Sequence, residues 1–274
     1  MRNNIGGYLG KRAHTNPDLE AVVDPATSRR LTYAQVDRRA NKVANAMIDL
    51  GVKKGDRVAI LMMNGVEFFE SFMGLAKIGA IVVPLNWRLV ADELSYILKD
   101  SGAAALIYGQ DFAEVAAELH DRGEEGTDLH HWIELSEAGE RNLFATEYGD
   151  LVAAGAEHPP ESDAGEDDDL FIMYTSGTTG LPKGAVISHG ATVWNLINTM
   201  TGRQDQTGQV SIIVGPLYHT AALNNHLTIQ LALGGTAVLV KKFQPESMLQ
   251  TIEQERVTTI SGSPAMYTLL MQHP

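Results

Sequence analysis

A run of ten residues, Thr175 to Gly184, combines the residue types that bind phosphate. Its sequence is TSGTTGLPKG, with three glycines, four hydroxyl side chains and one lysine. Glycine lets backbone N–H groups approach a ligand without hindrance from a Cβ atom, and successive N–H groups turned to one side form an anion-binding concavity. The hydroxyl groups and the mobile ammonium group of Lys183 add further donors. The run therefore predicts a binding loop for a polyphosphate.

Two better-known phosphate motifs do not match this loop. In the Walker motif the lysine follows a glycine and precedes Ser or Thr, whereas Lys183 precedes Gly184. The dinucleotide fingerprint G-x-G-x-x-G fails on spacing. A ligand-free turn is the alternative interpretation, but a simple turn needs only one or two special residues. An RNA-clamping G-x-x-G at 177–180 is disfavoured by the acidic charge balance and by the strand-like flanks.

Strand-like and helix-like segments alternate on both sides of the loop. Thr32 and Gln35 have the spacing of a capping box, and the helix that follows has an apolar stripe and stops at Gly51. We expect strands at 57–63, 80–85, 104–108, 170–175, 184–188, 210–215, 236–240 and 257–261. We expect further helices at 65–79, 92–99, 111–121, from 191, and at 220–233, 245–255 and 264–272. Residues 123–127 look like a loop. The alternation predicts an α/β fold with parallel-rich sheets flanked by helices.

The acidic charge is concentrated in one proline-containing segment. The formal net charge is −13, and residues 157–169 contain seven acidic residues and no Lys or Arg. We interpret this segment as a solvated linker. It predicts a boundary between a subdomain at 1–160 and an incomplete second subdomain at 161–274, which carries the phosphate loop. Clustered Lys and Arg are missing, so nucleic acid is not an expected partner.

The composition limits the chemistry and the cellular location that we expect for the chain. There are no cysteines, which excludes disulfides and thiolate chemistry and agrees with a cytoplasmic location. No apolar run approaches the ~20 residues of a membrane span, and the N-terminus lacks the apolar centre of a secretion signal. The sequence leaves open whether copies of the chain form a homo-oligomer.

The segment YTSGTTGLPKG resembles the signature of the adenylate-forming, AMP-binding superfamily. Three other segments are also similar to that superfamily: LTYAQVDRRANKVANAMIDLGVKKGDRVAILMMN, GLAKIGAIVVPLNWRL and GPLYHTAAL. The resemblance covers essentially the whole chain and is nearest in character to bacterial fatty-acyl-CoA synthetases. It implies the layered, large N-terminal domain of an adenylate-forming enzyme, with the C-terminal lid domain missing.

The resemblance also implies roles for the loop residues. The positions that match phosphate contacts of ATP in the family are Thr175, Ser176, Gly177, Thr178, Thr179, Gly180 and Lys183. Thr175 also matches a position that helps to hold Mg²⁺ beside the triphosphate. Lys183 and Thr175 are thus the residues that we expect to take part in catalysis.

A second segment resembles the substrate pocket of the family. A lone histidine such as His219 is by default a capping or core residue, but the resemblance implies a pocket wall. The pair Tyr218 and His219 offers no carboxylate to an ammonium group, which disfavours an amino-acid substrate. Ala221 and Ala222 leave room for an extended acyl chain, although close helix packing explains them equally well. For Ser188 and His189 we expect helix capping.

The resemblance implies a two-step reaction with a carboxylic acid, ATP and CoA. The acid and ATP give an acyl-adenylate and pyrophosphate, and CoA then gives the acyl-CoA thioester and AMP. The family's usual sequence continues past a point such as Pro274, so we expect an N-terminal fragment that catalyses neither step alone. Two alternatives stay open: an aryl- or alicyclic-carboxylate CoA ligase, and a non-catalytic nucleotide-binding module.

Overall fold

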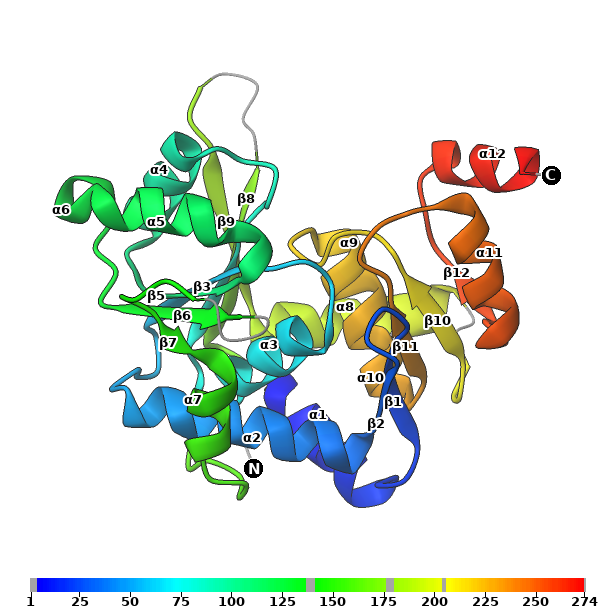
Figure 1. The fold of residues 1–274 in the computed structure, drawn as a ribbon. Coiled ribbons are helices and arrows are strands. Elements are labelled where there is room, and N and C mark those ends of the chain that lie inside the picture. Colours follow the sequence, from blue (N-terminus) through cyan, green and yellow to red (C-terminus); the bar gives the residue numbers. More distant parts are fainter. Residues whose placement is uncertain (1–3, 137–140, 176–179, 204–205, 274) are drawn as a thin grey trace.

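Two β-sheets organise the computed structural model, which describes residues 4–136, 141–175, 180–203 and 206–273 (Figure 1). The strands of the larger sheet are β3 (Arg57–Leu61), β4 (Ile81–Pro84), β5 (Ala103–Gly109), β6 (His131–Leu135), β7 (Thr146–Glu147), β8 (Asp169–Thr175) and β9 (Lys183–Ser188). Their order across the sheet is β7-β6-β5-β3-β4-β8-β9. Every neighbouring pair is parallel except β8 and β9, which form an antiparallel hairpin.

The smaller sheet combines strands from both ends of the chain. They are β1 (Glu20–Asp24), β2 (Arg29–Thr32), β10 (Val210–Ile213), β11 (Thr236–Leu239) and β12 (Thr259–Ile260), in the order β12-β10-β11-β1-β2. Only β1 and β2 pair in the antiparallel sense. The expected parallel-rich α/β fold is therefore confirmed.

Helices cover both faces of each sheet. They are α1 (Ile5–Thr15), α2 (Tyr33–Asp49), α3 (Val66–Ile78), α4 (Ala91–Ser101), α5 (Ala113–Asp121), α6 (Gly123–Gly126), α7 (Tyr148–Ala154), α8 (His189–Arg203), α9 (Thr220–Ala222), α10 (Thr228–Leu233), α11 (Pro245–Gln254) and α12 (Pro264–Gln272). A 3₁₀ turn (Gln110–Phe112) precedes α5, and a π-helical turn (Leu223–Leu227) joins α9 to α10.

The alternation of side chains along each strand separates the layers. Val58 and Ile60 of β3 belong to a core shared with α2, α3, α7, α8 and α10, whereas Ala59 and Leu61 face a core with α4 and α5. A third core joins the smaller sheet to α11 and α12. The result is five layers: helices, the larger sheet, a central layer of helices, the smaller sheet and outer helices (Figure 1).

The signals at both ends of α2 act as the sequence predicts. Thr32 Oγ1 accepts the Gln35 N–H, and the Gln35 side chain accepts the Thr32 N–H at 2.8 Å. Gly51 (φ +90°) and Gly79 (φ +72°) follow α2 and α3 in left-handed conformations that disfavour other residues. Inside α3, a Cβ on Gly74 would lie 2.8 Å from Ala40 O of α2. Glycine at this position therefore allows the two helices to pack closely.

The sheets do not divide at residue 160, where we predicted a boundary between subdomains. The hairpin β8–β9 completes the larger sheet beside β4, and β1 pairs with β11 in the smaller one. The acidic segment is also more than a solvated linker. Asn41 and Asn45 of α2 donate to its backbone carbonyls, and Lys54 pairs with Asp163 and Asp168.

The prediction of a loop at 123–127 is wrong for its first four residues. Residues 123–126 form the short helix α6, which follows α5 after Arg122 and begins at Gly123, whose φ is +56°. The Lys99 ammonium group donates to Glu124 O at 2.6 Å and to Glu125 O at 3.1 Å. This contact satisfies carbonyl groups that a single helical turn leaves free. The glycine content and charge of residues 123–127 do not predict the contact with Lys99.

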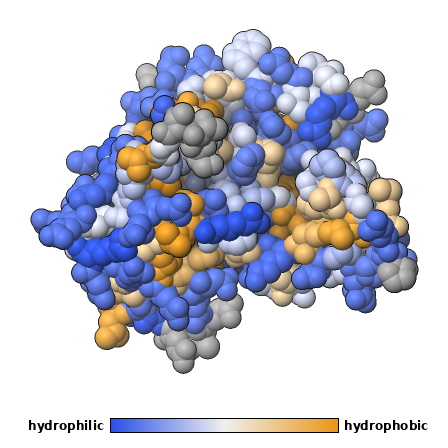
Figure 2. All heavy atoms as spheres, turned by 90° about the horizontal axis from the view of Figure 1, so that it is seen from above, coloured by the Kyte–Doolittle hydropathy of each residue, from blue (hydrophilic) through white to orange (hydrophobic). Residues whose placement is uncertain are grey.

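The surface is mostly hydrophilic, with several apolar patches on the face shown in Figure 2. Part of the exposed apolar surface belongs to α12, where Leu269 and Met271 are 48% and 79% exposed. None of the α12 residues is fully buried. Among the helices that the structure describes, none combines the length and the apolar character that crossing a membrane requires.

Candidate active site at the carboxyl ends of the strands

The β8–β9 hairpin places Thr175 and Lys183 opposite each other. They are direct partners in the antiparallel register, and both are exposed. In the described part of the chain Lys183 has no ion-pair partner. The expected phosphate contacts Ser176, Gly177, Thr178 and Thr179 lie outside the described residues.

Two glycines of the predicted loop have identifiable structural roles. Gly180 adopts φ +148° and has open space where a Cβ would project, so its missing side chain allows a backbone conformation that other residues rarely adopt. Gly184 lies opposite Tyr174, and a Cβ there would be 2.7 Å from Ile172 Cγ2 and 3.0 Å from Tyr174 Cζ. The first glycine serves the turn, and the second serves strand packing.

Tyr174 anchors the hairpin to the body of the protein. Its hydroxyl donates to Asp100 Oδ2 of α4 at 2.6 Å. Burial and the neighbouring carboxylate raise the pKa of Tyr174, so it remains a donor at physiological pH. Met173 points the other way, into the central core. Both side chains therefore have the packing roles that strand residues ordinarily have.

Strand β8 ends at the edge of the larger sheet where ligands of parallel α/β proteins bind. Strand β8 runs parallel to β4, and β4 runs parallel to β3, so their carboxyl ends meet at one edge. Thr175 is the last residue of β8. The segment after β3 contacts the end of β10 through Asn64, which donates to Gly215 O at 2.9 Å. The carboxyl ends of the two sheets therefore adjoin each other.

His219 follows β10 at this junction. It is exposed, and its Nδ1 accepts the Ala221 N–H at 3.2 Å at the start of α9. The structure thus places His219 as a helix cap, the role we expect of a lone histidine. Ala221 is exposed and Ala222 is buried, so close packing accounts for Ala222 alone. The substrate-pocket role of His219 and Ala221 stays a prediction.

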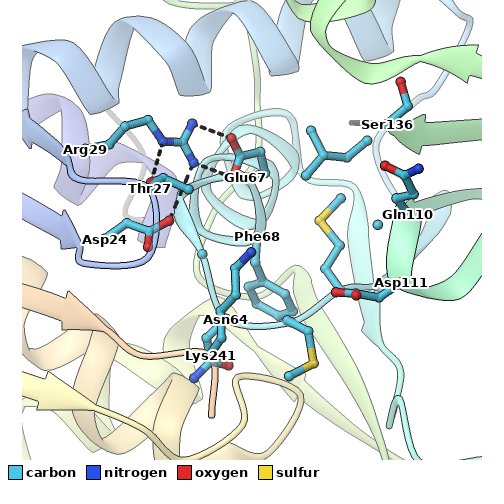
Figure 3. A pocket seen from close by; sticks show the side chains of 15 residues that line it. Asp24, Thr27, Arg29, Asn64, Glu67, Phe68, Gln110, Asp111, Ser136 and Lys241 are labelled. Atoms are coloured by element: carbon cyan, nitrogen blue, oxygen red, sulfur yellow. Dashed lines mark hydrogen bonds and ion pairs between the residues drawn. The ribbon is translucent and has the colours of Figure 1, made fainter. Parts of the chain in front are cut away.

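A cavity of about 430 Å³ opens at the same junction (Figure 3). It separates the segment after β3 from the segment after β5. These two neighbouring strands leave the sheet toward opposite faces, since β3 leads to α3 and β5 leads to α5. Such a divergence is where crevices form in parallel sheets. The polar side chains in its wall include Asp24, Thr27, Arg29, Asn64, Glu67, Gln110, Asp111, Ser136 and Lys241.

The charges in this cavity are partly neutralised by an ion pair that sequence reasoning missed. Arg29 Nη2 donates to Glu67 Oε2 at 2.8 Å and lies 3.6 Å from Asp24 Oδ2 (Figure 3). Burial acts to raise the Glu67 pKa, but the hydrogen bond and charge of Arg29 outweigh it and lower the pKa. Asp24 and Arg29 face each other across the local β1–β2 hairpin, whereas Glu67 comes from α3, 38 residues beyond Arg29. No local pattern in the sequence marks that long-range pair.

Ser188 and His189 cap helices, as expected, but not the same one. Ser188 Oγ accepts the Ala191 N–H of α8 at 3.1 Å. His189 Nδ1 instead accepts the Ile5 N–H of α1 at 3.1 Å. Burial lowers the pKa of His189 to about 4, and Asp168 and Lys54 act on it in opposite directions. The neutral ring therefore ties the N-terminal helix to α8.

The residues that the structure describes include no group of three or more His, Asp or Glu side chains that could hold a metal ion. The hydroxyl of Thr175 is a single oxygen donor, whereas Mg²⁺ takes six oxygen ligands. The described residues therefore do not form a protein cage for magnesium. The magnesium expectation rests on the sequence resemblance at Thr175.

Comparisons with known proteins agree with this geometry. Feruloyl-CoA synthase of Amycolatopsis sp is 38% identical over 275 residues, which are 100% of this chain and 52% of that protein. Long-chain-fatty-acid–CoA ligase FadD13 of Mycobacterium tuberculosis is 38% identical over 272 residues, 99% of this chain and 52% of that protein. The chain thus spans about half the length of the curated relatives it matches.

A solved structure shares the fold. The N-terminal domain of FACL13 from Mycobacterium tuberculosis, solved with an inhibitor bound, superposes with a TM-score of 0.92 at 36% identity. The superposition covers 100% of this chain and 66% of the FACL13 chain. The family described as AMP-binding enzyme matches residues 9–274, and this chain belongs to that family of CoA ligases and related adenylate-forming enzymes.

Proposed function

We propose that this chain is the N-terminal portion of an ATP-dependent ligase that converts a carboxylic acid, a fatty acid in particular, to its CoA thioester. The observation that carries the proposal is the pairing of Thr175 with Lys183 across a glycine-containing hairpin at the carboxyl edge of the larger sheet. Exposed apolar side chains on α12 support the view that further protein packs on this end.

The proposed first step joins two anions. A carboxylate oxygen attacks the α-phosphorus of ATP, the bond from that phosphorus to the pyrophosphate oxygen breaks, and an acyl-adenylate forms. Lys183 would reduce the repulsion between carboxylate and triphosphate, because its ammonium group has no competing ion pair in the described residues. In the second step the CoA thiolate attacks the acyl carbon and AMP leaves.

Fragment inactivity forms part of the proposal. Positioning accounts for much of the catalysis of phosphoryl and adenylyl transfer, and the described residues supply one face of a site. The magnesium ion and the cytoplasmic location remain predictions from the sequence. Pyrophosphate release by the purified 274 residues, dependent on both ATP and a carboxylate, would contradict the proposed inactivity.

An aryl-carboxylate CoA ligase is the second candidate. It is favoured by the 38% identity to feruloyl-CoA synthase, equal to the identity to the fatty-acid ligase. The small and exposed Ala221 at the start of α9 supports the fatty-acid candidate, because it leaves space beside the junction of the sheets.

Comparing dodecanoate with benzoate in a pyrophosphate-release assay of the complete protein tests the choice. We expect kcat/KM to be at least about tenfold higher for dodecanoate, since burial of each additional CH₂ group contributes about 0.8 kcal/mol. A preference for benzoate would select the second candidate. Binding of ATP without turnover of either acid would instead favour a non-catalytic nucleotide-binding module.

A further inference from the structure

One amide side chain joins the ends of the two sheets. Asn64 follows β3 and is only 3% exposed. Its Nδ2 group donates to the carbonyl oxygens of Gly215 at 2.9 Å and Val240 at 3.1 Å. A longer contact of 3.4 Å reaches Ile213 O, and Asn64 Oδ1 accepts the Leu217 N–H at 2.9 Å. Asn64 therefore holds both the β10 and the β11 ends from the opposite sheet.

The contacts concentrate on one short segment. Three of the four go to residues 213–217, which lead directly to Tyr218 and His219. Leu217 is 1% exposed, so its N–H group has no access to bulk water. Loss of the Asn64 side chain would leave this buried donor unpaired, which is costly in a low-dielectric interior.

Only a primary amide of this length fits the arrangement. The carbonyl oxygens of Gly215 and Val240 require a donor, and the Leu217 N–H requires an acceptor on the same planar group. An aspartate would keep the acceptor but replace the donor with a repulsive oxygen. Asn64 lines the cavity beside Lys241 (Figure 3), so the amide lies where the carboxyl ends of the two sheets meet.

We propose that Asn64 is a positioning residue for the carboxylate substrate. It fixes the segment from Gly215 to Ala222, and through this segment it sets the place of the predicted pocket residues His219 and Ala221. The inference rests on the proposed function of the same site. Asn64 acts on substrate affinity through the backbone that it holds, without contact with ATP or the acid.

Kinetics of the Asn64→Ala variant of the complete protein test this role. We expect the KM for the carboxylate to rise about tenfold, which corresponds to about 1.4 kcal/mol, while the KM for ATP changes less than about twofold. Asn64→Asp, which is closer in shape and keeps the Leu217 contact, should shift the carboxylate KM in the same direction. An unchanged carboxylate KM in both variants would overturn the role.

Asn45 offers a matched control. Its amide also holds two backbone carbonyls, Ala156 O at 2.8 Å and His158 O at 2.9 Å, but these lie at the start of the acidic segment and just before it, beside α2. Asn45→Ala should lower the melting temperature and leave both KM values unchanged. If it raised the carboxylate KM as much as Asn64→Ala, the effect would be one of general stability and the positioning role would be wrong.

Hydrogen exchange separates this inference from the proposed function. In Asn64→Ala, amide exchange across residues 214–222 should become about tenfold faster, while exchange in β3 stays the same. Unchanged exchange in 214–222 would contradict the positioning role whatever the enzyme does. Faster exchange in a protein that turns over no carboxylate would support the contact and contradict the proposed ligase function.

Discussion

At the scale of single residues, Lys183 carries the clearest functional expectation. The sequence predicted a mobile ammonium group beside a glycine-rich loop, and the hairpin brings it opposite Thr175 with both side chains exposed. Its place opposite Thr175 follows from the hairpin, because residues close in sequence across a short hairpin must also be close in space. Its role in binding phosphate stays a prediction.

Lys183→Ala should therefore impair the use of ATP and spare the fold. Removal of a charged hydrogen bond to phosphate costs about 1.5–3 kcal/mol, so we expect kcat/KM for ATP to fall by about tenfold to a hundredfold. Unfolding stability should change by less than about 0.5 kcal/mol, as for other exposed residues. Initial rates of pyrophosphate release across ATP concentrations, together with thermal melts, give both values.

Lys53→Ala is the matched control for this variant. Lys53 is also exposed, but it precedes β3 at the amino ends of the parallel strands, away from the edge that carries Thr175. Its removal should leave the ATP dependence unaltered. Equal rates for the wild type and Lys183→Ala at every ATP concentration would exclude the phosphate role of Lys183.

Other site residues could not be found at this scale. Arg29, Glu67 and Asn64 are unremarkable in the sequence, because the Arg29–Glu67 pair and the Asn64 contacts join segments more than thirty residues apart. Long-range pairings leave no local composition or period. His219 differs from these residues, because its capping contact is with a residue two positions away and could be predicted from the sequence. A contact of His219 with a substrate could not be predicted in this way.

At the scale of elements, prediction succeeded where a local signal sets the ends. The capping box at Thr32 and the glycine at 51 define the two ends of α2. Helix α1 was missed because three glycines interrupt its sequence. It is stabilised by packing, since a Cβ on Gly6 would lie 2.5 Å from the Lys77 backbone nitrogen. Tertiary contact here outweighs low helix propensity.

The docking of α1 on His189 predicts a pH dependence of stability. The pKa of His189 falls from 6.5 in the unfolded reference to about 4 in the folded chain, so protonation favours unfolding. Its contribution is complete above about pH 6.5 and is lost as the pH falls toward 4. Between pH 7 and pH 5 the loss is about 2 kcal/mol.

Urea unfolding of the wild type and His189→Asn at these two pH values measures the loss. Asparagine keeps an acceptor for the Ile5 N–H but does not titrate, so the variant should lose about 2 kcal/mol less than the wild type between pH 7 and pH 5. His14→Asn, at an exposed position in the same helix α1, should lose as much as the wild type. Identical pH profiles for wild type and His189→Asn would contradict a buried neutral ring.

At the scale of the whole molecule, the division of the chain at residue 160 stays a prediction. The acidic segment has the charge and prolines of a linker, yet the strands on its two sides pair with each other in both sheets. The partner of a strand depends on which sheet edges are still unpaired when it folds. The sequence of one chain carries no local pattern that identifies this partner. The class of fold was predictable from alternation, while the strand order was not.

The shared sheets predict that neither half of the chain folds alone. Without residues 161–274, β4 loses β8, whose Phe171 is fully buried, and β1 loses its partner β11. Without residues 1–160, the hairpin β8–β9 keeps no neighbouring strand, and a two-stranded hairpin is only marginally stable in water. The intact chain should therefore unfold in one cooperative transition, whereas each half should show none.

Circular dichroism during urea titration of the three polypeptides measures this, with dispersed amide resonances as a second criterion for folding. The contrast depends on the halves being cut at residue 160, because that cut separates β4 from β8 and β1 from β11 at once. A cooperative transition in either half would show that one sheet tolerates the loss of its neighbour, and the predicted boundary would then mark an independent folding unit. Without such a transition, the carboxyl edge that holds Thr175 exists only when both halves have assembled.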